Sequence, residues 1–178
     1  MNEHESLVAA IYEEVKLHAY DPSWPVAYAT ERERLLSVLP GVFLDVQHIG
    51  STAVPGLAAK PIIDILAGVE SMAVAESVTA LLCASGYTTS AEFNETLRDR
   101  KWFMRWANGH RTHHLHVVVH GGQVWHERLR FRDALCSNPV LAARYAELKA
   151  ESAEKHPTDR DAYTDAKAEF VRSVSRAA

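Results

Sequence analysis

One stretch organises this chain: residues 48–66 read HIGSTAVPGLAAKPIIDIL. A β-like run over residues 42–49 ends inside it, and a turn-rich segment follows at residues 50–56. From Pro61 to Val69 the chain is nearly continuously apolar, which is typical of a strand buried on both faces, so we expect this strand in the centre of a sheet. Polar residues therefore stand at the end of one predicted strand and inside the next.

The segments on either side alternate between helical and strand spacing. Asn108-Gly109 lies between two β-like runs and suits the two-residue turn of an antiparallel hairpin. Strands that alternate with helices, followed by a helical last third, indicate an α+β or α/β fold built on one mixed sheet. The spacing predicts helices over residues 5–16, 26–39, 72–85, 124–136, 139–155 and 159–175, and strands over residues 42–49, 61–69, 101–106 and 112–120.

Length and composition indicate one domain, residues 1–178, with a core at about 15–122 and a helical tail at about 123–178. The net charge of −4 excludes a basic field over the whole molecule, so we expect neither nucleic acid nor a membrane as a partner. No apolar run is long enough to cross a bilayer, and the opening MNEHES lacks the pattern of a signal peptide. Two widely spaced cysteines fit a reducing compartment, so a cytoplasmic location is expected.

The turn after the first predicted strand has the residue types of a phosphate-binding loop. Gly50 lets backbone N–H groups approach an anion, and the hydroxyl groups of Ser51 and Thr52 would add hydrogen bonds to phosphate oxygens. Lys60 follows closely and Lys101 flanks the predicted hairpin, so both would balance phosphate charge. Glycine, serine and threonine also occur together in ordinary turns, and that alternative stays open.

The remaining cationic and aromatic residues allow two interpretations. Arg105 and Arg111 flank the hairpin and would either extend a cationic patch or stay solvated. Arg100 lies in the charged stretch 95–101, which we expect to be a solvated loop. Tryptophans most often anchor cores, and Trp24, in the loop before a helix, is the best candidate to stack on a nucleobase instead.

Asp64 is the carboxylate of the central predicted strand and stands between Ile63 and Ile65. An unpaired carboxylate is costly to bury. We therefore expect Asp64 to hold a metal, to meet a cation or to lie at the open end of the strand, with the capping of a nearby backbone N–H as the simpler alternative.

The stretch that contains Asp64 resembles the signature of the GrpB family, whose members are related in fold to the nucleotidyltransferase superfamily. The resemblance implies a nucleotidyltransferase-like core, and it covers most of the chain. It includes Tyr20-Asp-Pro-Ser-Trp-Pro25, Lys101-Trp-Phe103, His113-His-Leu-His116, Trp125, Phe131-Arg-Asp133, Asn138-Pro139, Tyr145-Ala-Glu-Leu-Lys149, and Asp159-Arg160 with Tyr163 and Lys167.

In that superfamily a Gly-Ser pair follows the first strand, and two carboxylates on the next strand bind two divalent ions that align a nucleotide with its acceptor. The resemblance maps Gly50, Ser51 and Asp64 onto this scheme. Leu66 stands where the second acid belongs, and leucine cannot bind a hard cation. A standard two-ion centre is therefore not expected.

Histidines on a later strand offer another set of ligands. His114 and His116 are two residues apart and share one face of the strand predicted over residues 112–120. With Asp64, and with His48 as a further member, they would form a set suited to Zn²⁺, Mn²⁺ or Fe²⁺. The alternative is that the imidazoles form hydrogen bonds on a half-polar sheet face, or that one acts as a neutral base.

These observations lead to a working hypothesis of metal-dependent nucleotidyl transfer to, or processing of, a small phosphorylated molecule. A nucleotide or other phosphorylated ligand is the expected partner, and a divalent ion, Mg²⁺ or Mn²⁺ with Zn²⁺ as an option, is the expected cofactor. One alternative is a non-catalytic nucleotide-binding or phosphate-binding module without the second carboxylate, and another is a hydrolase with a transition metal. The hypothesis makes Asp64 and His116 catalytic, Gly50, Ser51, Thr52, Lys60 and Lys101 phosphate-binding, and Asp64, His114 and His116 metal-binding.

Overall fold

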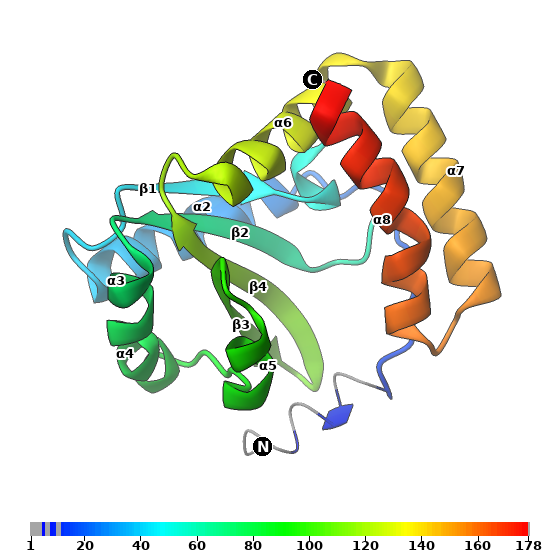
Figure 1. Cartoon of the computed structure of the whole chain (residues 1–178). Coiled ribbons are helices and arrows are strands. Elements are labelled where there is room, and N and C mark those ends of the chain that lie inside the picture. Colours follow the sequence, from blue (N-terminus) through cyan, green and yellow to red (C-terminus); the bar gives the residue numbers. More distant parts are fainter. Residues whose placement is uncertain (1–4, 6–7, 10–11, 178) are drawn as a thin grey trace.

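The computed structural model describes residues 5, 8–9 and 12–177, and a mixed sheet forms its centre (Figure 1). In the described part the sheet has four strands in the order β1-β2-β4-β3. The β1–β2 and β3–β4 pairs are antiparallel and the β2–β4 pair is parallel, so β2 is an interior strand, as its continuous apolar run predicts. The strands are β1 Asp45–Ile49, β2 Ile63–Val69, β3 Arg100–Ala107 and β4 His110–Val119.

The hairpin between β3 and β4 forms at the predicted Asn-Gly turn. Asn108 and Gly109 have φ of 53° and 76°, which is the pair of positive φ values that a type I′ turn requires. An irregularity in the register between Arg105 and Trp106 then shifts the pairing, so that Trp106 lies opposite Arg111. This bulge decides which side of the sheet Arg111 occupies.

One face of the sheet is covered by α2 Trp24–Val38, α3 Met72–Ser77 and α4 Thr79–Ala84 (Figure 1). The largest group of buried side chains lies there and includes Leu35, Ile65 and Phe103. Residues 72–85 form two short helices rather than the one predicted, because apolar spacing does not show a break such as the one at Val78.

Two predictions, a loop over residues 95–101 and a helix over residues 5–16, were wrong in part. Residues 95–101 are not a loop throughout: α5 Ala91–Thr96 begins at the Ser90 cap and reaches into that stretch, and β3 starts at Arg100. Of the residues predicted as a first helix, 5–16, the described residues 5, 8–9 and 12 are helical and residues 13–16 are not, while the predicted apolar positions Leu7 and Ile11 lie outside the described residues. Tertiary bonds replace the helix there, since Val15 N–H donates to Pro157 O at 2.9 Å.

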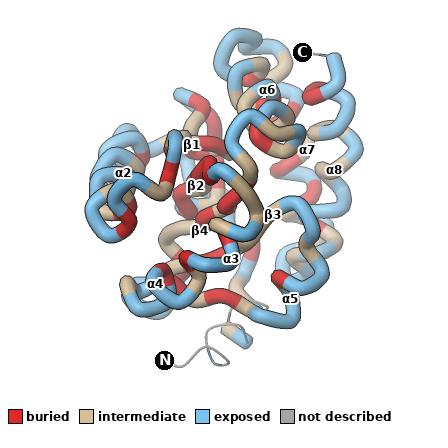
Figure 2. The backbone as a smooth tube through the Cα atoms, turned by 60° about the vertical axis from the view of Figure 1, so that its left-hand side comes forward, coloured by how far each residue is buried: buried red, intermediate tan, exposed pale blue. Residues whose placement is uncertain are grey.

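The helical tail packs on the opposite face of the sheet and on itself (Figure 1). Its first helix covers the sheet through Trp125, which packs with Ile49, Leu66 and Val118. Figure 2 shows buried backbone at the sheet and exposed backbone along the outer sides of the helices. No helix of the described residues is long and apolar enough to span a membrane. The tail consists of α6 Gln123–Ser137, α7 Pro139–Lys155 and α8 Arg160–Ala177.

Candidate functional site

Asp64 lies on the tail-side face of β2, and the structure brings His114 and His116 to it. His114 Nδ1 lies 3.2 Å from Asp64 Oδ1 and His116 Nε2 lies 3.9 Å from the same oxygen. The first distance is that of a hydrogen bond and the second is too long for one. The Asp64 side chain is 30% exposed, so the carboxylate remains accessible. We call this set the Asp64 site.

Arg111 determines which nitrogen of His114 carries its proton. The bulge in β3 and β4 places Arg111 opposite Trp106, on the same face as His114, and Arg111 Nη1 lies 3.3 Å from His114 Nε2. A guanidinium only donates, so His114 Nε2 accepts and its Nδ1–H donates to Asp64. Arg111 Nε donates to Glu13 at 2.8 Å, so Arg111 is buried and ion-paired rather than solvated.

The ionisation of this cluster follows from burial and hydrogen bonding. Burial raises the pKa of Asp64, but the hydrogen bond from His114 and the closeness of both imidazole rings outweigh it and hold that pKa well below its usual range. Burial lowers the pKa of His116 to about 4. Near neutral pH the site therefore holds an aspartate anion beside a neutral His116, whose buried Nδ1 has no hydrogen-bond partner among the described residues.

In the Gly-Ser-Thr turn, Gly50 and Ser51 lie at this site and Thr52 does not. Gly50 has φ of 74°, and an added β-carbon would lie 2.6 Å from Asp64 Oδ2, so glycine is required for this close approach. The Ser51 side chain hydrogen-bonds Tyr145 of α7, whose burial raises its pKa to about 12. Thr52 is buried and its hydroxyl lies 2.9 Å from His48 Nε2, so it is engaged inside the protein.

Two residues expected at the site lie on the other face of the sheet. His48 pairs in register with Ile65 rather than with Asp64, and its ring stacks on Tyr28 at 4.7 Å. Lys101 pairs in register with Val117 and forms a 2.7 Å ion pair with Glu76. Side chains alternate between faces along a strand, so the structure does not bring His48 or Lys101 to Asp64.

Three lysines approach the Asp64 site from the side of the tail. The Lys60 and Lys167 ammonium groups lie 4.9 and 4.0 Å from the centre of the Tyr163 ring. Lys149 donates to the backbone oxygen of Ala58. Burial lowers the pKa of Lys60 and Lys167 to about 8 and that of Lys149 to about 7. We call Lys60, Lys149 and Lys167 the lysine cluster.

Lys149 and Lys167 belong to the segments that resemble the family but were assigned no role from the sequence, although a signal for them exists. Each lysine lies four residues after a buried tyrosine, Tyr145 in α7 and Tyr163 in α8, so tyrosine and lysine share one helix face. A lysine within the buried stripe of an amphipathic helix is unusual unless it has a partner.

The charge around Asp64 is positive although the whole chain is acidic. The Asp64 carboxylate favours the charged form of each surrounding cation and so opposes the lowering of their pKa values by burial. Glu13 is a second acid close to this group, through Arg111. The cations that surround Asp64 are Lys60, Lys149, Lys167, Arg111 and Arg128.

The donor atoms do not fit a resident two-ion centre. Leu66 is 0% exposed and packs against Trp125 and Val118, so no second acid stands beside Asp64 on this strand. Within the described ranges, no group of three or more histidine, cysteine, aspartate or glutamate side chains is arranged to hold a metal ion. The described side chains therefore do not form a two-ion centre.

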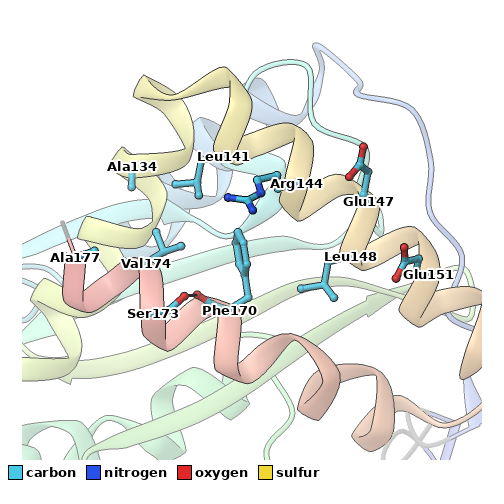
Figure 3. Close-up of a pocket in the computed structure, with 10 residues that line it drawn as sticks. All are labelled: Ala134, Leu141, Arg144, Glu147, Leu148, Glu151, Phe170, Ser173, Val174 and Ala177. Carbon is cyan, nitrogen blue, oxygen red and sulfur yellow. Dashed lines mark hydrogen bonds between the residues drawn. The ribbon is translucent and has the colours of Figure 1, made fainter.

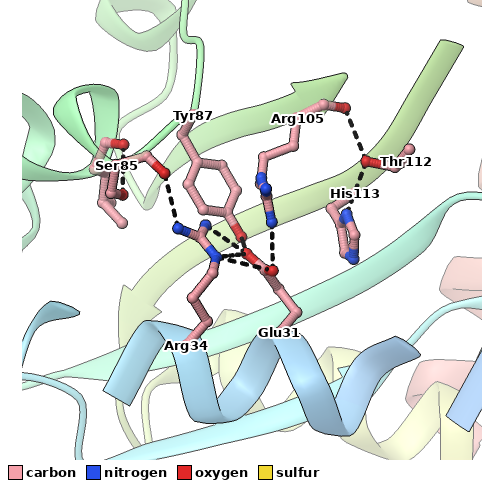
Figure 4. Close-up of polar contacts among 8 residues, drawn as sticks. Glu31, Arg34, Ser85, Tyr87, Arg105, Thr112 and His113 are labelled. Atoms are coloured by element: carbon pink, nitrogen blue, oxygen red, sulfur yellow. Dashed lines mark hydrogen bonds and ion pairs between the residues drawn. The ribbon is translucent and has the colours of Figure 1, made fainter. Parts of the chain in front are cut away.

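The remaining candidates are structural. Trp24 is not in the loop before the helix but is the first residue of α2; it is 6% exposed, and its ring packs in the core with an edge contact to Tyr20. Arg105 lies on the α2 side, where its Nη1 binds Glu31 Oε2 at 2.5 Å (Figure 4). Arg34 and Tyr87 bind the same carboxylate, each at 2.7 Å (Figure 4).

A separate groove of about 750 Å³ lies in the helical tail (Figure 3). Its lining includes the apolar residues Leu141, Leu148 and Phe170 and the charged residues Arg144 and Glu147. None of its lining residues belongs to the Asp64 site, so the site and the groove are different surfaces.

Comparisons with known proteins agree with this architecture. The family model described as GrpB protein matches residues 14–177. The glutamate-rich protein GrpB of Alkalihalophilus pseudofirmus is 36% identical over 165 residues, which cover 90% of this chain and 94% of that protein. The UPF0157 protein YqkA of Bacillus subtilis is 34% identical over 160 residues, which cover 90% of this chain but only 46% of that protein.

One solved structure of a GrpB protein has the same fold as this chain. The conserved protein GrpB from Enterococcus faecalis has a TM-score of 0.80 at 34% identity and covers 90% of this chain and 95% of that chain. A cytoplasmic RNA terminal U-transferase has a TM-score of 0.43 at 15% identity over 84% of this chain and 47% of that chain, a likeness too weak to carry an argument. The fold and site define a mixed α+β protein with a helical tail over a cationic sheet face. The chain belongs to the GrpB family.

Proposed function

We propose that this protein binds a phosphorylated small molecule, a nucleotide or a related polyphosphate, at the Asp64 site. The observation that carries the proposal is the lysine cluster. Lys60, Lys149 and Lys167 come from a loop and two helices, and none of them has a carboxylate partner among the described residues. An anion is the missing partner that this arrangement favours.

The energetics support an anionic ligand. A buried cation without a partner is costly, and the lowered pKa values of the lysines express that cost. The ring of Tyr163 offsets part of it for Lys60 and Lys167, and the carbonyl of Ala58 does so for Lys149. A phosphate chain would supply several negative charges at once.

The Gly-Ser turn would hold the same ligand from the sheet side. Ser51 bonds Tyr145 of α7, so the turn and the tail meet at this point. Its hydroxyl can rotate toward a phosphate oxygen, and the absent side chain of Gly50 leaves the ligand room next to Asp64. In this proposal Gly50, Ser51, Lys60, Lys149 and Lys167 bind phosphate.

Nucleotidyl transfer is a second candidate, favoured by the position of His114 and His116 beside the ionised Asp64. An acceptor hydroxyl would attack the α-phosphorus, the bond from that phosphorus to the bridging oxygen would break, and pyrophosphate would leave. Asp64 or His116 would accept the hydroxyl proton. The substrate would be a nucleotide with its bound divalent ion. Asp64 would bind that ion, and His114 and His116 lie next to Asp64.

Isothermal titration calorimetry separates these possibilities. The protein is titrated with ATP, CTP, GTP, UTP and inorganic tripolyphosphate, once with a chelator and once with Mn²⁺. We expect binding in the chelator, at least tenfold weaker in Lys167→Met and unchanged in Lys155→Met, an exposed lysine at the end of α7. Binding that Lys167→Met does not weaken contradicts the proposal, and pyrophosphate release with a phosphorylated acceptor would establish transfer.

A further inference from the structure

Arg100 and Arg128 form a second group of cations on the same side of the sheet. Arg100 begins β3 opposite Val118, and Trp102, two residues on, pairs with His116, so Arg100 and His116 lie on one face. Arg128 comes from α6, which covers this face. Arg100 and Arg128 act on each other electrostatically, and Arg128 acts on His116. The sequence analysis assigned Arg100 to a solvated loop and did not consider Arg128.

Two buried nitrogen atoms beside Arg128 lack hydrogen-bond partners in the described part of the chain. Arg100 Nε and His116 Nδ1 are buried, and neither has a hydrogen-bond partner among the described residues. Arg128 forms no ion pair with any carboxylate in the described residues. Burial and the charge of Arg100 lower the pKa of Arg128, whereas Asp64, Asp99 and Glu127 act in the opposite direction.

The nearby acid does not neutralise this pair. Asp99 lies 3.9 Å from Arg100 Nη1, at the limit of an ion pair, and its side chain is 58% exposed. Two guanidinium groups that act on each other repel, and an anion between them removes that repulsion. A tetrahedral dianion meets both charges and accepts the parallel N–H donors that guanidinium groups present.

The two cationic groups lie on opposite sides of Asp64 along the strand direction. Lys60 precedes β2, whereas Arg100 is level with Val118 and therefore with Gly68, four residues beyond Asp64. At a rise of about 3.3 Å per residue, Arg100 is displaced by about 13 Å from the level of Asp64. The two groups are therefore centred at different levels of the sheet, which favours two separate anions.

We propose that Arg100 and Arg128 bind a phosphate monoester dianion, with His116 Nδ1 facing it, as a second anion site across Asp64 from the lysine cluster. This inference rests on the proposed function and deepens it. The polyphosphate lies on the lysine cluster, the second molecule carries its own phosphate on the arginine pair, and Asp64 lies between them. A phosphorylated acceptor is the substrate class that fits this arrangement.

Nuclear magnetic resonance titration with inorganic phosphate tests the second site separately from the first. The backbone amides of Gly50 and Ser51 report on the lysine cluster, and the Nε–Hε signals of Arg100 and Arg128 report on the arginine pair. We expect both sets to shift and saturate with phosphate. Acetate at equal ionic strength should shift the arginine signals little, which separates a phosphate site from a general carboxylate site.

Variants then assign each response. Arg128→Met should weaken the phosphate response of Arg100 at least tenfold and leave that of Gly50 unchanged, whereas Lys167→Met should do the reverse. Arg130→Met, an exposed arginine of the same helix, should change neither, and the dispersed spectrum of each variant verifies its fold. If the Nε–Hε signals of Arg100 and Arg128 do not shift with phosphate, or shift equally with acetate, the proposal of a second site is wrong. A lost response at Gly50 with intact arginine responses overturns the proposed function alone.

Discussion

A β-carbon at position 50 would lie 2.6 Å from Asp64 Oδ2, so Gly50 and Asp64 fit together only because residue 50 has no side chain. The carboxylate thus lies against the backbone of the Gly-Ser turn on one side and against His114 on the other. Any change that moves the turn also moves the carboxylate.

Gly50→Ala tests this relationship, and Gly56→Ala is its matched control. Gly50 and Gly56 have positive φ, of 74° and 80°, so alanine is strained at either position, at a cost of about 1–3 kcal/mol. Only position 50 has a clash, because nothing lies within 4 Å of a β-carbon at Gly56. We expect urea unfolding to show an additional loss of about 1–3 kcal/mol for Gly50→Ala. Equal losses in the two variants would mean that the carboxylate does not need the turn.

Glu31→Gln is expected to destabilise the fold without touching the Asp64 site. The Glu31 side chain is 4% exposed and binds Arg34 and Arg105, whose side chains are 29% and 28% exposed (Figure 4). Removing one partner of a buried ion pair costs about 3–5 kcal/mol, and the partial exposure of the arginines favours the lower end of that range. Chemical unfolding should show this loss, while Glu33→Gln, an exposed position of the same helix, should change stability by less than about 0.5 kcal/mol.

Anion affinity should fall as the pH rises. The pKa of Lys149 is lowered to about 7 and those of Lys60 and Lys167 to about 8, so these groups lose charge from neutral pH upward. Asp64 stays ionised and Tyr145 stays neutral over this range. Calorimetric titration with tripolyphosphate between pH 6 and pH 9 should show the decline, and an affinity independent of pH would contradict it.

The same lysines predict the sign of the pH dependence of stability without ligand. Their pKa is 10.5 in the unfolded chain and about 7 to 8 in the folded protein, so between these values the unfolded state binds more protons. The contribution of Lys60, Lys149 and Lys167 to stability should therefore rise with pH across this window. Lys149→Met, which removes one such group, should make the rise smaller in urea unfolding measured at pH 7 and pH 9.

Leu66→Asp is expected to destabilise the protein rather than to create a metal centre. Leu66 is fully buried against Trp125, where an added carboxylate would lose its hydration. Urea unfolding should show a loss of several kcal/mol for Leu66→Asp and about 1 kcal/mol or less for Leu66→Met. A stable Leu66→Asp protein that binds Mn²⁺ stoichiometrically would contradict the packing described here.

The sequence predicts the fold well where a local rule determines the structure. The apolar run of β2 marks the interior strand, and Asn108-Gly109 marks the hairpin, since both signals lie within a few residues. α5 was not predicted, because six residues are too few to show the apolar spacing of a helix. The Asn94 side chain fixes α5 on the sheet by accepting a hydrogen bond from Trp102 N–H at 2.9 Å. That contact depends on the tertiary structure.

The site divides in the same way. Strand alternation places His114 and His116 on one face, and the parallel register with β2 then brings them to Asp64. The side of the sheet that His48 and Lys101 face depends on registers that a single strand does not reveal. Lys149 and Arg128 come from helices whose docking on the sheet is set by packing, so their helix positions alone do not show that they face Asp64.

A crystal structure of the protein with a non-hydrolysable ATP analogue, grown with a chelator, tests the central claim most directly. The account predicts phosphate oxygens within hydrogen-bond distance of Ser51 Oγ and of the ammonium group of Lys149 or Lys167. An analogue bound in the groove between α6, α7 and α8, or crystals in which a saturating concentration leaves Ser51 and the lysine cluster without ligand, would contradict it.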